Sequence, residues 1–279
     1  MTVWFITGAS RGFGLEITKE ALSRGDSVIA TARNPQAVLD EFPADADRLL
    51  AIPLDVHQPD QITAAVDAGI EKFGRIDALV NNAGRGLLGA VEEATDEDVR
   101  AVFDVNVFGL LAVTRAVLPH LRAQRSGLVV NLSSVAGFVA SAGWGVYAST
   151  KFAVEALSEA MAQELGPLGI RVVAIEPGPF RTNFLDGSSL GVVSTEIDDY
   201  AATVGKTRRW ATETNYGQDG DPVKAAKIIV DLADRVDIPQ RIQLGANAFQ
   251  RIAEKLARTA RDQEAWRETA LWADFEPAS

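Results

Sequence analysis

The sequence predicts an α/β fold: a doubly wound parallel sheet of about seven strands with helices on both faces. Three observations predict it. Short apolar runs alternate with longer amphipathic segments, as in successive β-α-β units. The runs themselves are apolar along most of their length, as in strands that are covered on both sides. A glycine-rich turn, TGASRGFG, joins the first run to the first amphipathic segment.

Each expected element follows from this alternation, taken in chain order. The expected strands are residues 3–7, 27–32, 49–54, 78–81, 128–132, 171–176 and 241–244. The expected helices include residues 59–73, 96–122, 147–165 and 222–234. Gly25 after the first helix, Thr95 before an acidic turn, and Asp221 before Pro222 are typical of helix ends.

The 279 residues show no composition break or Pro/Ser-rich linker, so we expect one domain over residues 1–245. Within it, residues 178–220 lose the apolar rhythm and gain Gly, Ser and Thr, which is typical of a substrate loop or lid. A passive surface loop is the alternative. Residues 246–279 are expected to form a helical extension of the same domain, with a charged amphipathic helix over 247–271.

Charge and composition exclude several classes of protein. Lys and Arg number 27 against 38 Asp and Glu, for a net charge of −11, which argues against a nucleic-acid partner. With no cysteine, disulfides, thiolate nucleophiles and Cys-ligated zinc or iron–sulfur sites are excluded. His57 and His120 do not form an HExxH spacing, so we expect no metal site.

The sequence also indicates where the protein is found. Its start, MTVWFITGAS, lacks a basic region followed by a cleavable apolar segment. Charged residues such as Arg115 interrupt the most apolar helical stretches before they reach the roughly 20 residues that cross a bilayer. We therefore expect a soluble, cytoplasmic protein with no membrane contact.

The glycine-rich turn predicts a phosphate-binding site. Gly8, Gly12 and Gly14 would let the backbone turn sharply and approach a pyrophosphate at the positive end of the following helix. We expect Ser10, Arg11 and Phe13 of the same turn to contact the nucleotide. A purely structural turn is the alternative, but the strand before it and the helix after it favour dinucleotide binding.

The end of the second expected strand indicates which dinucleotide fits. An acidic residue there would bind a ribose 2′-hydroxyl, but this chain has Ala32 and Arg33. Arg33 and Arg11 together could clamp a 2′-phosphate through charge-assisted hydrogen bonds. The sequence therefore favours NADP(H) over NAD(H), the alternative being two solvated arginines.

Tyr147 and Lys151 lie four residues apart, on one face of an expected helix. Tyrosine has an unperturbed pKa of about 10, and we expect the lysine charge to lower it so that the phenol can exchange a proton with a substrate oxygen. Ser134, at the end of the LVVNLSS strand, would hold that oxygen. A surface tyrosine and lysine are the alternative for the spacing alone.

From Val3 to about Leu244 the chain resembles a short-chain dehydrogenase/reductase of the ordinary, roughly 250-residue type, with a Rossmann-type fold. The resemblance rests on the T-G-x-x-x-G-x-G loop, the Asn81-Asn82-Ala83-Gly84 segment, Ser134, and the Y-x-x-x-K pair in the family's order. Because Ser133 precedes Ser134, the family's thirteen-residue interval to the tyrosine selects Ser134. The resemblance implies hydride transfer between a nicotinamide cofactor and a carbonyl/alcohol pair.

Further site residues are implied by this resemblance alone. Asn106, in DVNVFG, matches the fourth catalytic position, which positions a water beside the lysine; its alternative is a structural amide that kinks the helix. Asp55, with Val56 beside it, matches the adenine side of the cofactor site. Asn82, Ala83 and Gly84 match the segment that borders the ribose, and Tyr147 and Lys151 are also expected to contact the cofactor. Pro177, Gly178 and Thr182 match the P-G-x-x-x-T stretch, whose threonine contacts the nicotinamide side.

The resemblance also implies a homodimer or homotetramer built on the helices over 96–122 and 147–165, or else helices that only cover the sheet. The residues that the motifs bring near the nicotinamide predict a lipophilic or aromatic carbonyl/alcohol substrate, although core packing is an equal explanation for about half of them. These residues are Phe138, Val139, Trp144, Phe180, Phe184 and Leu185. Arg85 and Arg181 leave an acidic substrate open.

Two other functions compete with this interpretation. A non-catalytic NADP(H)-binding redox sensor would need the glycine loop but not the tyrosine and lysine, so the intact set favours catalysis. A serine hydrolase would need a G-x-S-x-G elbow and a suitably placed histidine, and the sequence contains no such elbow.

Overall fold

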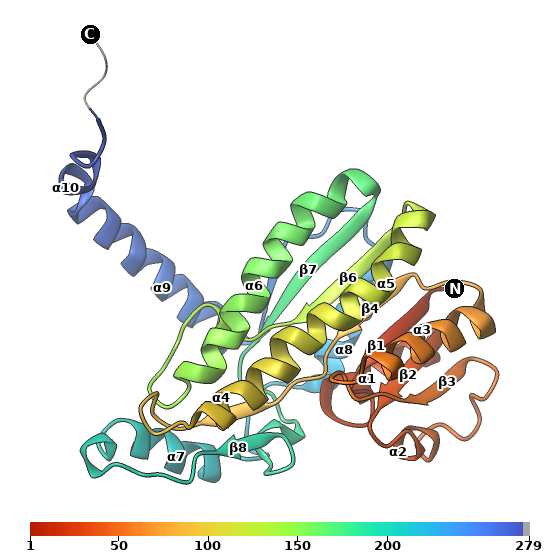
Figure 1. The fold of residues 1–279 in the computed structure, drawn as a ribbon, viewed down its shortest axis with the longest axis horizontal. Coiled ribbons are helices and arrows are strands. Elements are labelled where there is room, and N and C mark those ends of the chain that lie inside the picture. Colours follow the sequence, from red (N-terminus) through yellow and green to blue (C-terminus); the bar gives the residue numbers. More distant parts are fainter. Residues whose placement is uncertain (276–279) are drawn as a thin grey trace.

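The apolar runs form the seven-stranded sheet that the sequence predicts, as a computed structural model of the chain shows for residues 1–275 (Figure 1). The strand order is β3-β2-β1-β4-β6-β7-β9, and every neighbouring pair is parallel. Starting at β1, the chain winds first to one edge of the sheet and then to the other. The two halves part between β1 and β4, and ligands of doubly wound sheets bind at the strand ends there.

The main sheet consists of β1 (Val3–Thr7), β2 (Ser27–Ala32), β3 (Leu49–Pro53), β4 (Ala78–Asn81), β6 (Gly127–Leu132), β7 (Ile170–Pro177) and β9 (Arg241–Leu244). The helices are α1 (Gly12–Ser23), α2 (Gln36–Leu39), α3 (Pro59–Phe73), α4 (Asp96–Phe103), α5 (Leu110–Gln124), α6 (Gly145–Leu165), α7 (Val204–Glu213), α8 (Pro222–Asp231), α9 (Ala246–Ala265) and α10 (Arg267–Leu271).

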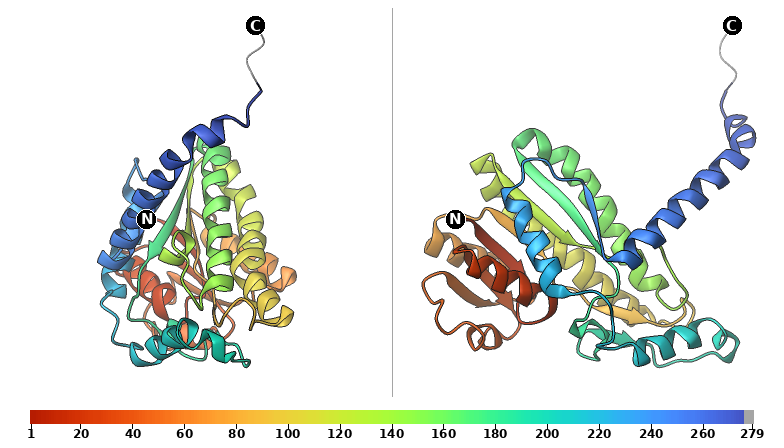
Figure 2. Two further views of the ribbon diagram at one scale, coloured as in Figure 1. Left: turned by 90° about the vertical axis from the view of Figure 1, so that its left-hand side faces the viewer. Right: turned by 180° about the vertical axis from the view of Figure 1, so that it is seen from behind.

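Helices cover both faces of the sheet because successive strand residues point to opposite sides. Along β1, Trp4 and Ile6 pack into the layer under α1 and α8, whereas Val3 and Phe5 pack into the layer under α3, α5 and α6. The second layer faces the viewer in Figure 1, and the first is seen from behind in Figure 2. This burial on both faces explains the nearly continuous apolar runs of the sequence.

The seven predicted strands are confirmed, and their ends differ from the prediction by one residue at most. The capping signals are also confirmed: Thr95 accepts from the backbone of Asp98 in a reciprocal capping box, and Asp221 accepts from the N–H groups at the start of α8. Two predicted helices are divided. A π-helical turn, Asp104–Gly109, separates α4 from α5, and the helix expected over 247–271 breaks at Trp266. Residues 276–279 of the expected extension lie outside the described residues.

The segment 178–220 has more regular structure than the sequence indicates. It contains β8 (Leu190–Val192) and α7, and β8 pairs in parallel with β5 (Gly86–Leu88) in a second, two-stranded sheet. Figure 1 shows this segment folded across one end of the main sheet. Strands of three residues leave too short an apolar pattern to be recognised in the sequence.

Glu93 anchors this segment to the rest of the fold. Its buried carboxylate accepts from Ile197 N at 2.9 Å, from Ala90 N at 2.7 Å and from Arg208 Nη2 at 2.7 Å. Burial alone would raise the pKa of Glu93. The N–H donors and the Arg208 guanidinium lower it by a larger amount, so the net shift of the pKa is downward. One charged side chain therefore holds the turn before α4, the loop at Ile197 and α7 together.

One helical run among the described residues, Asp96–Gln124, is long and apolar enough by composition to cross a membrane, with a mean hydropathy of 1.7 over its best window. The expectation that Arg115 keeps this stretch too short to cross a bilayer is therefore wrong by length and composition. In the fold its buried residues Val113, Val117 and Leu121 pack in the core on α3 and the sheet.

Replacing Glu93 with Gln should loosen the 178–220 segment, because Arg208 would lose its buried countercharge. We expect amide hydrogen exchange across residues 190–213 to become about tenfold faster or more while exchange in the main sheet stays unchanged. Glu92→Gln is the matched control, since Glu92 is exposed and, among residues 1–275, accepts only from the Tyr200 hydroxyl. Equal exchange in the two variants would contradict the anchoring role.

Candidate active site

The glycine loop is held by the segment that follows β4. Thr7 Oγ1 accepts from the backbone N–H groups of Asn82 and Ala83, each at 3.0 Å. Asn82 Nδ2 donates to Thr7 O at 2.8 Å and to Gly8 O at 3.0 Å. Gly8 and Gly12 have φ angles of +67° and +55°, a region that favours glycine. The polar side chains of Thr7, at the end of β1, and Asn82, just after β4, thus fix the loop.

The same loop offers a place for an anion. A Cβ on Gly14 would lie 2.3 Å from Gly8 O, so glycine lets α1 start directly behind the loop. Arg11 precedes α1 without a side-chain cap, which leaves the first N–H groups of the helix available. Gly12 and Phe13 at this helix start line a large cavity. A dinucleotide pyrophosphate fits this combination of free N–H groups and a positive helix end.

The cavity has a volume of about 1260 Å³ and runs from the glycine loop to α6 and the 178–220 segment. Most of the predicted site residues line it: Gly8, Ser10, Arg11, Gly12, Phe13, Arg33, Asp55, Val56, Asn82, Ala83, Gly84, Ser134, Tyr147, Lys151, Pro177, Gly178 and Thr182. Gly14 and Asn106 do not. The fold therefore brings together in one cavity motifs that are spread over most of the chain.

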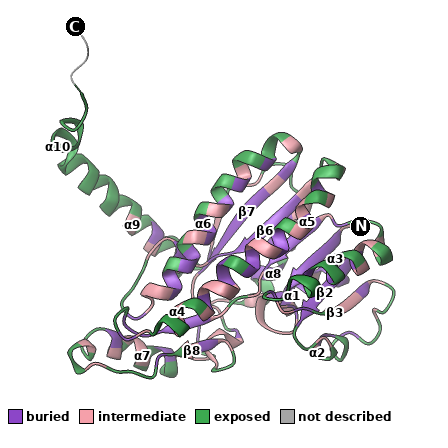
Figure 3. Cartoon of the chain, in the orientation of Figure 1, coloured by how far each residue is buried: buried purple, intermediate pink, exposed green. Residues whose placement is uncertain are grey.

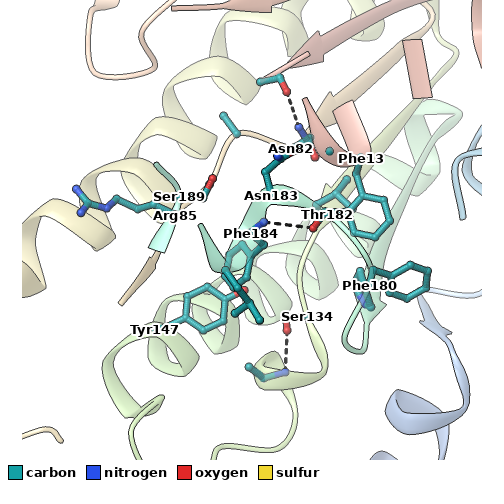
Figure 4. Close-up of a pocket in the computed structure, with 18 of the residues that line it drawn as sticks. Phe13, Asn82, Arg85, Ser134, Tyr147, Phe180, Thr182, Asn183, Phe184 and Ser189 are labelled. Atoms are coloured by element: carbon teal, nitrogen blue, oxygen red, sulfur yellow. Dashed lines mark hydrogen bonds between the residues drawn. The ribbon is translucent and has the colours of Figure 1, made fainter. Parts of the chain in front are cut away.

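Aromatic rings surround the tyrosine on the cavity wall. The centroid of the Tyr147 ring lies 5.7 Å from that of Trp144 and 5.4 Å from that of Phe184, and Trp144 and Phe184 stack at 6.4 Å. Figure 4 shows Phe184 beside Tyr147, with Ser134 nearby. Phe184 is positioned by Thr182, whose hydroxyl accepts from Phe184 N at 3.4 Å. Tyr147 is 6% exposed, so its hydroxyl stands in largely apolar surroundings.

Burial controls the acidity of this phenol. It raises the pKa of Tyr147 well above the ordinary value, and the hydroxyl of Ser134 only partly opposes that shift. The expected lowering by Lys151 is absent here. Lys151 Nζ lies 5.9 Å from the centroid of the tyrosine ring and donates instead to Leu132 O at 2.6 Å. In this structure the phenol therefore keeps its proton at neutral pH.

Lys151 is itself perturbed by burial, which lowers its pKa to about 8, while the negative charge of Glu155 opposes the shift. Glu155 follows Lys151 by one turn of α6 and is also buried. Lys151 Nζ also lies close to Gly84: a Cβ atom built on that glycine would be 3.8 Å from Nζ. The cation thus sits between the end of β6, the segment after β4 and the cavity.

The two serines at the end of β6 have different surroundings. Ser134 lines the cavity, and its Oγ accepts from Ala136 N at 3.0 Å. Ser133 is buried beneath it, faces Glu155 and lowers the pKa of that carboxyl. The interval that selects Ser134 in the sequence thus selects the serine on the cavity side.

Glu155 and Glu176 form a buried acidic pair under the site. Burial, together with the negative charge of Glu176, raises the pKa of Glu155 to about 7, and burial also raises the pKa of Glu176. Arg241 Nε donates to Glu155 Oε2 at 3.0 Å and lies 4.0 Å from Glu176 Oε1. Oε1 of both glutamates is buried without a hydrogen-bond partner among residues 1–275. One guanidinium cannot compensate two ionised carboxylates, so we infer that the pair holds a proton.

Asn106 lies beside the site rather than on the cavity wall. Its Nδ2 donates to Arg85 O at 2.9 Å and to Thr150 Oγ1 at 3.0 Å, and its Oδ1 accepts from Arg85 N at 2.9 Å. It sits in the π-helical turn between α4 and α5. The side chain therefore ties three segments together, which agrees with the structural alternative for this residue. Its side-chain atoms are all occupied by protein partners.

Arg11, Arg181 and Phe138 have partners other than the ligands that the sequence suggested for them. Arg11 donates from Nη1 to Ser188 Oγ at 2.8 Å, so in this structure it reaches across to the 178–220 segment. Arg181 does not line the cavity, because its guanidinium binds Gln218 O. Phe138 also lies off the cavity wall, under the guanidinium of Arg241.

Several residues that the sequence did not single out line the cavity. Lys206 and Trp210 come from α7, Arg251 comes from α9, and Gln218 has a buried Oε1 with no partner among the described residues. Gln218 is only 3% exposed. Nothing in the sequence around it forms a recognisable motif, so its place on the cavity wall could be found only from the fold.

Comparison with known proteins agrees with this geometry. A sequence model of the family described as short chain dehydrogenase matches residues 2–190. The chain belongs to the short-chain dehydrogenase family. It is 38% identical over 272 residues to "Oxidoreductase BOA17" of Botryotinia fuckeliana, covering 96% of this chain and 98% of that protein. It is 36% identical to a 3-ketodihydrosphingosine reductase of Bacteroides thetaiotaomicron, covering 86% of each.

Solved structures agree with the family assignment. A short-chain dehydrogenase from Streptomyces avermitilis is 40% identical, with a TM-score of 0.91, and the match covers 98% of this chain and all of that one. More distant solved dehydrogenases, each 25% identical, hold an NADP derivative in one case and NAD in another. This dehydrogenase is therefore an oxidoreductase with a nicotinamide dinucleotide site.

In the cofactor-free protein, Lys151 should titrate near pH 8, and Glu155→Gln should shift its titration to lower pH. Removing the glutamate charge takes away the interaction that favours the protonated amine, so the pKa of Lys151 falls further. NMR of the ¹⁵Nζ-labelled lysines, with Lys151→Met for assignment, measures this. Glu159→Gln is the control, because Glu159 also binds Arg241 but is half exposed. An unchanged titration in Glu155→Gln would contradict the electrostatic role.

Proposed function

We propose that this dehydrogenase uses NADP(H) to interconvert a ketone or aldehyde and the corresponding alcohol, with Tyr147 as the general acid and base. The observation that carries the proposal is a buried tyrosine beside Ser134, in a cavity continuous with the glycine loop. The nicotinamide, when bound, supplies hydride to the carbonyl carbon or accepts it from the alcohol. The protein residues handle the oxygen and its proton.

Ser134 binds the carbonyl oxygen through its hydroxyl, which points into the cavity. Tyr147 then donates its proton to that oxygen as negative charge develops on it. The phenol of Tyr147 carries its proton at neutral pH, as reduction requires, and burial shifts its pKa further in that direction. Lys151 is still largely protonated at pH 7, but its amine would have to leave Leu132 O and approach the phenol before its charge could favour the phenolate.

The charges around the cavity support NADP(H) over NAD(H). Arg33 is exposed at the end of β2 and lines the cavity, and no acidic side chain replaces it there. A guanidinium in this place binds a 2′-phosphate, whereas a carboxylate would bind the free hydroxyl. Arg11 is the second candidate, and its bond to Ser188 would have to open before it could reach a phosphate.

The cavity wall supports a lipophilic or aromatic substrate. Val139, Trp144, Phe184 and Leu185 line it, and Trp144 and Phe184 pack beside Tyr147. The relative from Bacteroides thetaiotaomicron is named for a ketone of the sphingosine class, in agreement with an apolar substrate. Offering ketones, aldehydes and quinones of increasing chain length with NADPH tests both this preference and catalysis itself. Tight NADPH binding without cofactor oxidation by any of them would favour the redox-sensor alternative.

Tyr147→Phe should lower kcat by about 10²- to 10⁴-fold, because it removes the proton donor and leaves the ring packing intact. NADPH affinity, measured by fluorescence titration, should stay within about threefold of the parent. Trp144→Phe is the matched control for disturbance of the aromatic cluster and should retain most of the turnover. Parent-like turnover by Tyr147→Phe would exclude this tyrosine as the acid.

Arg33→Ala should raise the Kd for NADPH by about 10- to 100-fold and leave that for NADH nearly unchanged, since only NADPH carries the 2′-phosphate. Arg24→Ala serves as the control arginine, because it lies at the far end of α1 and does not line the cavity. Calorimetric titration of both variants with both cofactors measures the effect. An equal loss for the two cofactors would refute a phosphate-specific role.

A further inference from the structure

The large cavity is lined by more positive than negative side chains. Of the described residues that line it, six are Lys or Arg and one, Asp55, is acidic, although the whole chain has a net charge of −11. Three of the six lie in the glycine loop, at the end of β2 and beside Tyr147. The other three are Arg85, Lys206 and Arg251. The fold therefore gathers positive charge in this cavity that the composition of the chain does not predict.

Arg85 and Arg181 are the two arginines that the sequence suggested for an acidic substrate, and the fold uses both elsewhere. The guanidinium of Arg181 binds a backbone carbonyl and does not line the cavity. Arg85 lines the cavity, but its guanidinium lies against β8, and Figure 4 shows it directed away from Tyr147. The cations that remain for a substrate are Lys206 and Arg251.

Lys206 and Arg251 come from different helices and meet the same loop. Residues 139–144 form this loop, which leads into α6 and the tyrosine. On α7, Thr207 Oγ1, next to Lys206, donates to a backbone carbonyl of the loop at 2.9 Å. From α9, Arg251 Nη2 donates to Ser141 Oγ of the loop at 2.8 Å. Both cations are thus held at the same end of the cavity, where α7, α9 and this loop come together.

Neither cation is neutralised by a carboxylate. On α7 the neighbouring Arg208 pairs with the buried Glu93 at 2.7 Å. In contrast, no carboxylate of residues 1–275 lies within 4.0 Å of Lys206 Nζ or of the Arg251 guanidinium. Lys206 is exposed and Arg251 is half-buried, and Figure 3 shows that most of α7 is exposed or intermediate rather than buried. Two charges without a countercharge in a cleft attract anions from solution.

An apolar wall connects the tyrosine with these cations. Trp144 packs beside Tyr147, with ring centroids 5.7 Å apart, and also packs against a cluster that includes Ala211 of α7. Trp210, the preceding residue, is 40% exposed and lines the cavity. Trp210 follows Lys206 by one turn of α7, so their side chains share a face of the helix. The wall thus leads from the phenol over two indole rings to an ammonium group.

We propose that the substrate is an amphiphilic carbonyl compound whose apolar chain ends in an oxyanion, a carboxylate or a phosphate, bound by Lys206 and Arg251. This inference rests on the proposed function, since it places the carbonyl at Tyr147 and the chain along Trp144 and Trp210. A guanidinium can bind either oxyanion through two parallel hydrogen bonds, and an ammonium adds a point charge. The two cations would set the chain length and orientation of the substrate.

The charge preference is testable without turnover, by calorimetric titration of the full protein saturated with NADP⁺. The probes are decanoate, decyl phosphate, decanamide and decylamine, which have similar chains and differ in the charge of the end group. Decanoate and decyl phosphate should bind about tenfold or more tightly than decanamide, and decylamine should bind most weakly. Added salt should reduce this preference because it screens the charges. The tighter of the two anions identifies the oxyanion that the site favours.

Substitutions at the two cations assign the preference. Lys206→Gln and Arg251→Gln should each lower the ratio of decanoate to decanamide affinity by about threefold or more, and the double variant should bring it close to one. Arg251→Lys keeps the charge and should keep most of the ratio, which separates the charge from the bond to Ser141. Arg209→Gln is the matched control, since Arg209 is exposed on the same helix but does not line the cavity.

Equal affinity of the parent protein for decanoate and decanamide would overturn the inference, as would an equal fall of the ratio in Lys206→Gln and Arg209→Gln. Turnover of the ω-oxo acid of the same length and of its methyl ester separates this inference from the proposed function. Reduction of the ester as efficiently as the acid, measured by kcat/KM, would sink the inference and leave the reductase activity in place. Selective binding of decanoate without NADPH oxidation by either compound would support the anion site and contradict the proposed function.

Discussion

The packing of α6 against the end of β6 is the interaction on which the site depends. Lys151 donates to Leu132 O, and Glu155, one turn further along α6, faces Ser133. These two contacts hold the two residues that precede Ser134. The same helix carries Tyr147, so one rigid element fixes the serine and the tyrosine relative to each other. The acidic pair and Arg241 stabilise this arrangement from below.

Burial then decides the charge of each group more than proximity does. Spacing along a helix suggests that a lysine four residues from a tyrosine will make the phenol more acidic. In the folded chain, both groups lose water, and desolvation raises the pKa of the tyrosine and lowers that of the lysine. Each group is moved toward its neutral form. The phenol of Tyr147 therefore holds its proton. The amine of Lys151 stays protonated at neutral pH partly because the negative charge of Glu155 raises its pKa.

The sequence predicts the main sheet and most of the cavity wall because these depend on local patterns. Continuous apolar runs define buried strands, and the glycine loop and the Tyr147–Lys151 spacing bring their residues to one edge of a parallel sheet. Contacts between distant segments were not predictable. The pairing of β5 with β8, the Glu93–Arg208 pair, and the bond from Arg11 to Ser188 each join segments about 100 or more residues apart. For Asn106 the sequence left a catalytic role and a helix-kinking amide both open, and its bonds to Arg85 and Thr150, which the fold alone shows, agree with the second.

The most direct test of this account is the ionisation of Tyr147 in the cofactor-free protein. The chain has three tyrosines, so ¹³Cζ-tyrosine NMR with one Tyr→Phe variant for each assigns all signals. If burial controls the site, the Tyr147 signal should show no ionisation up to about pH 10, the ordinary tyrosine value. A midpoint about one unit or more below that value would contradict the account, because it would show that a nearby positive charge outweighs desolvation.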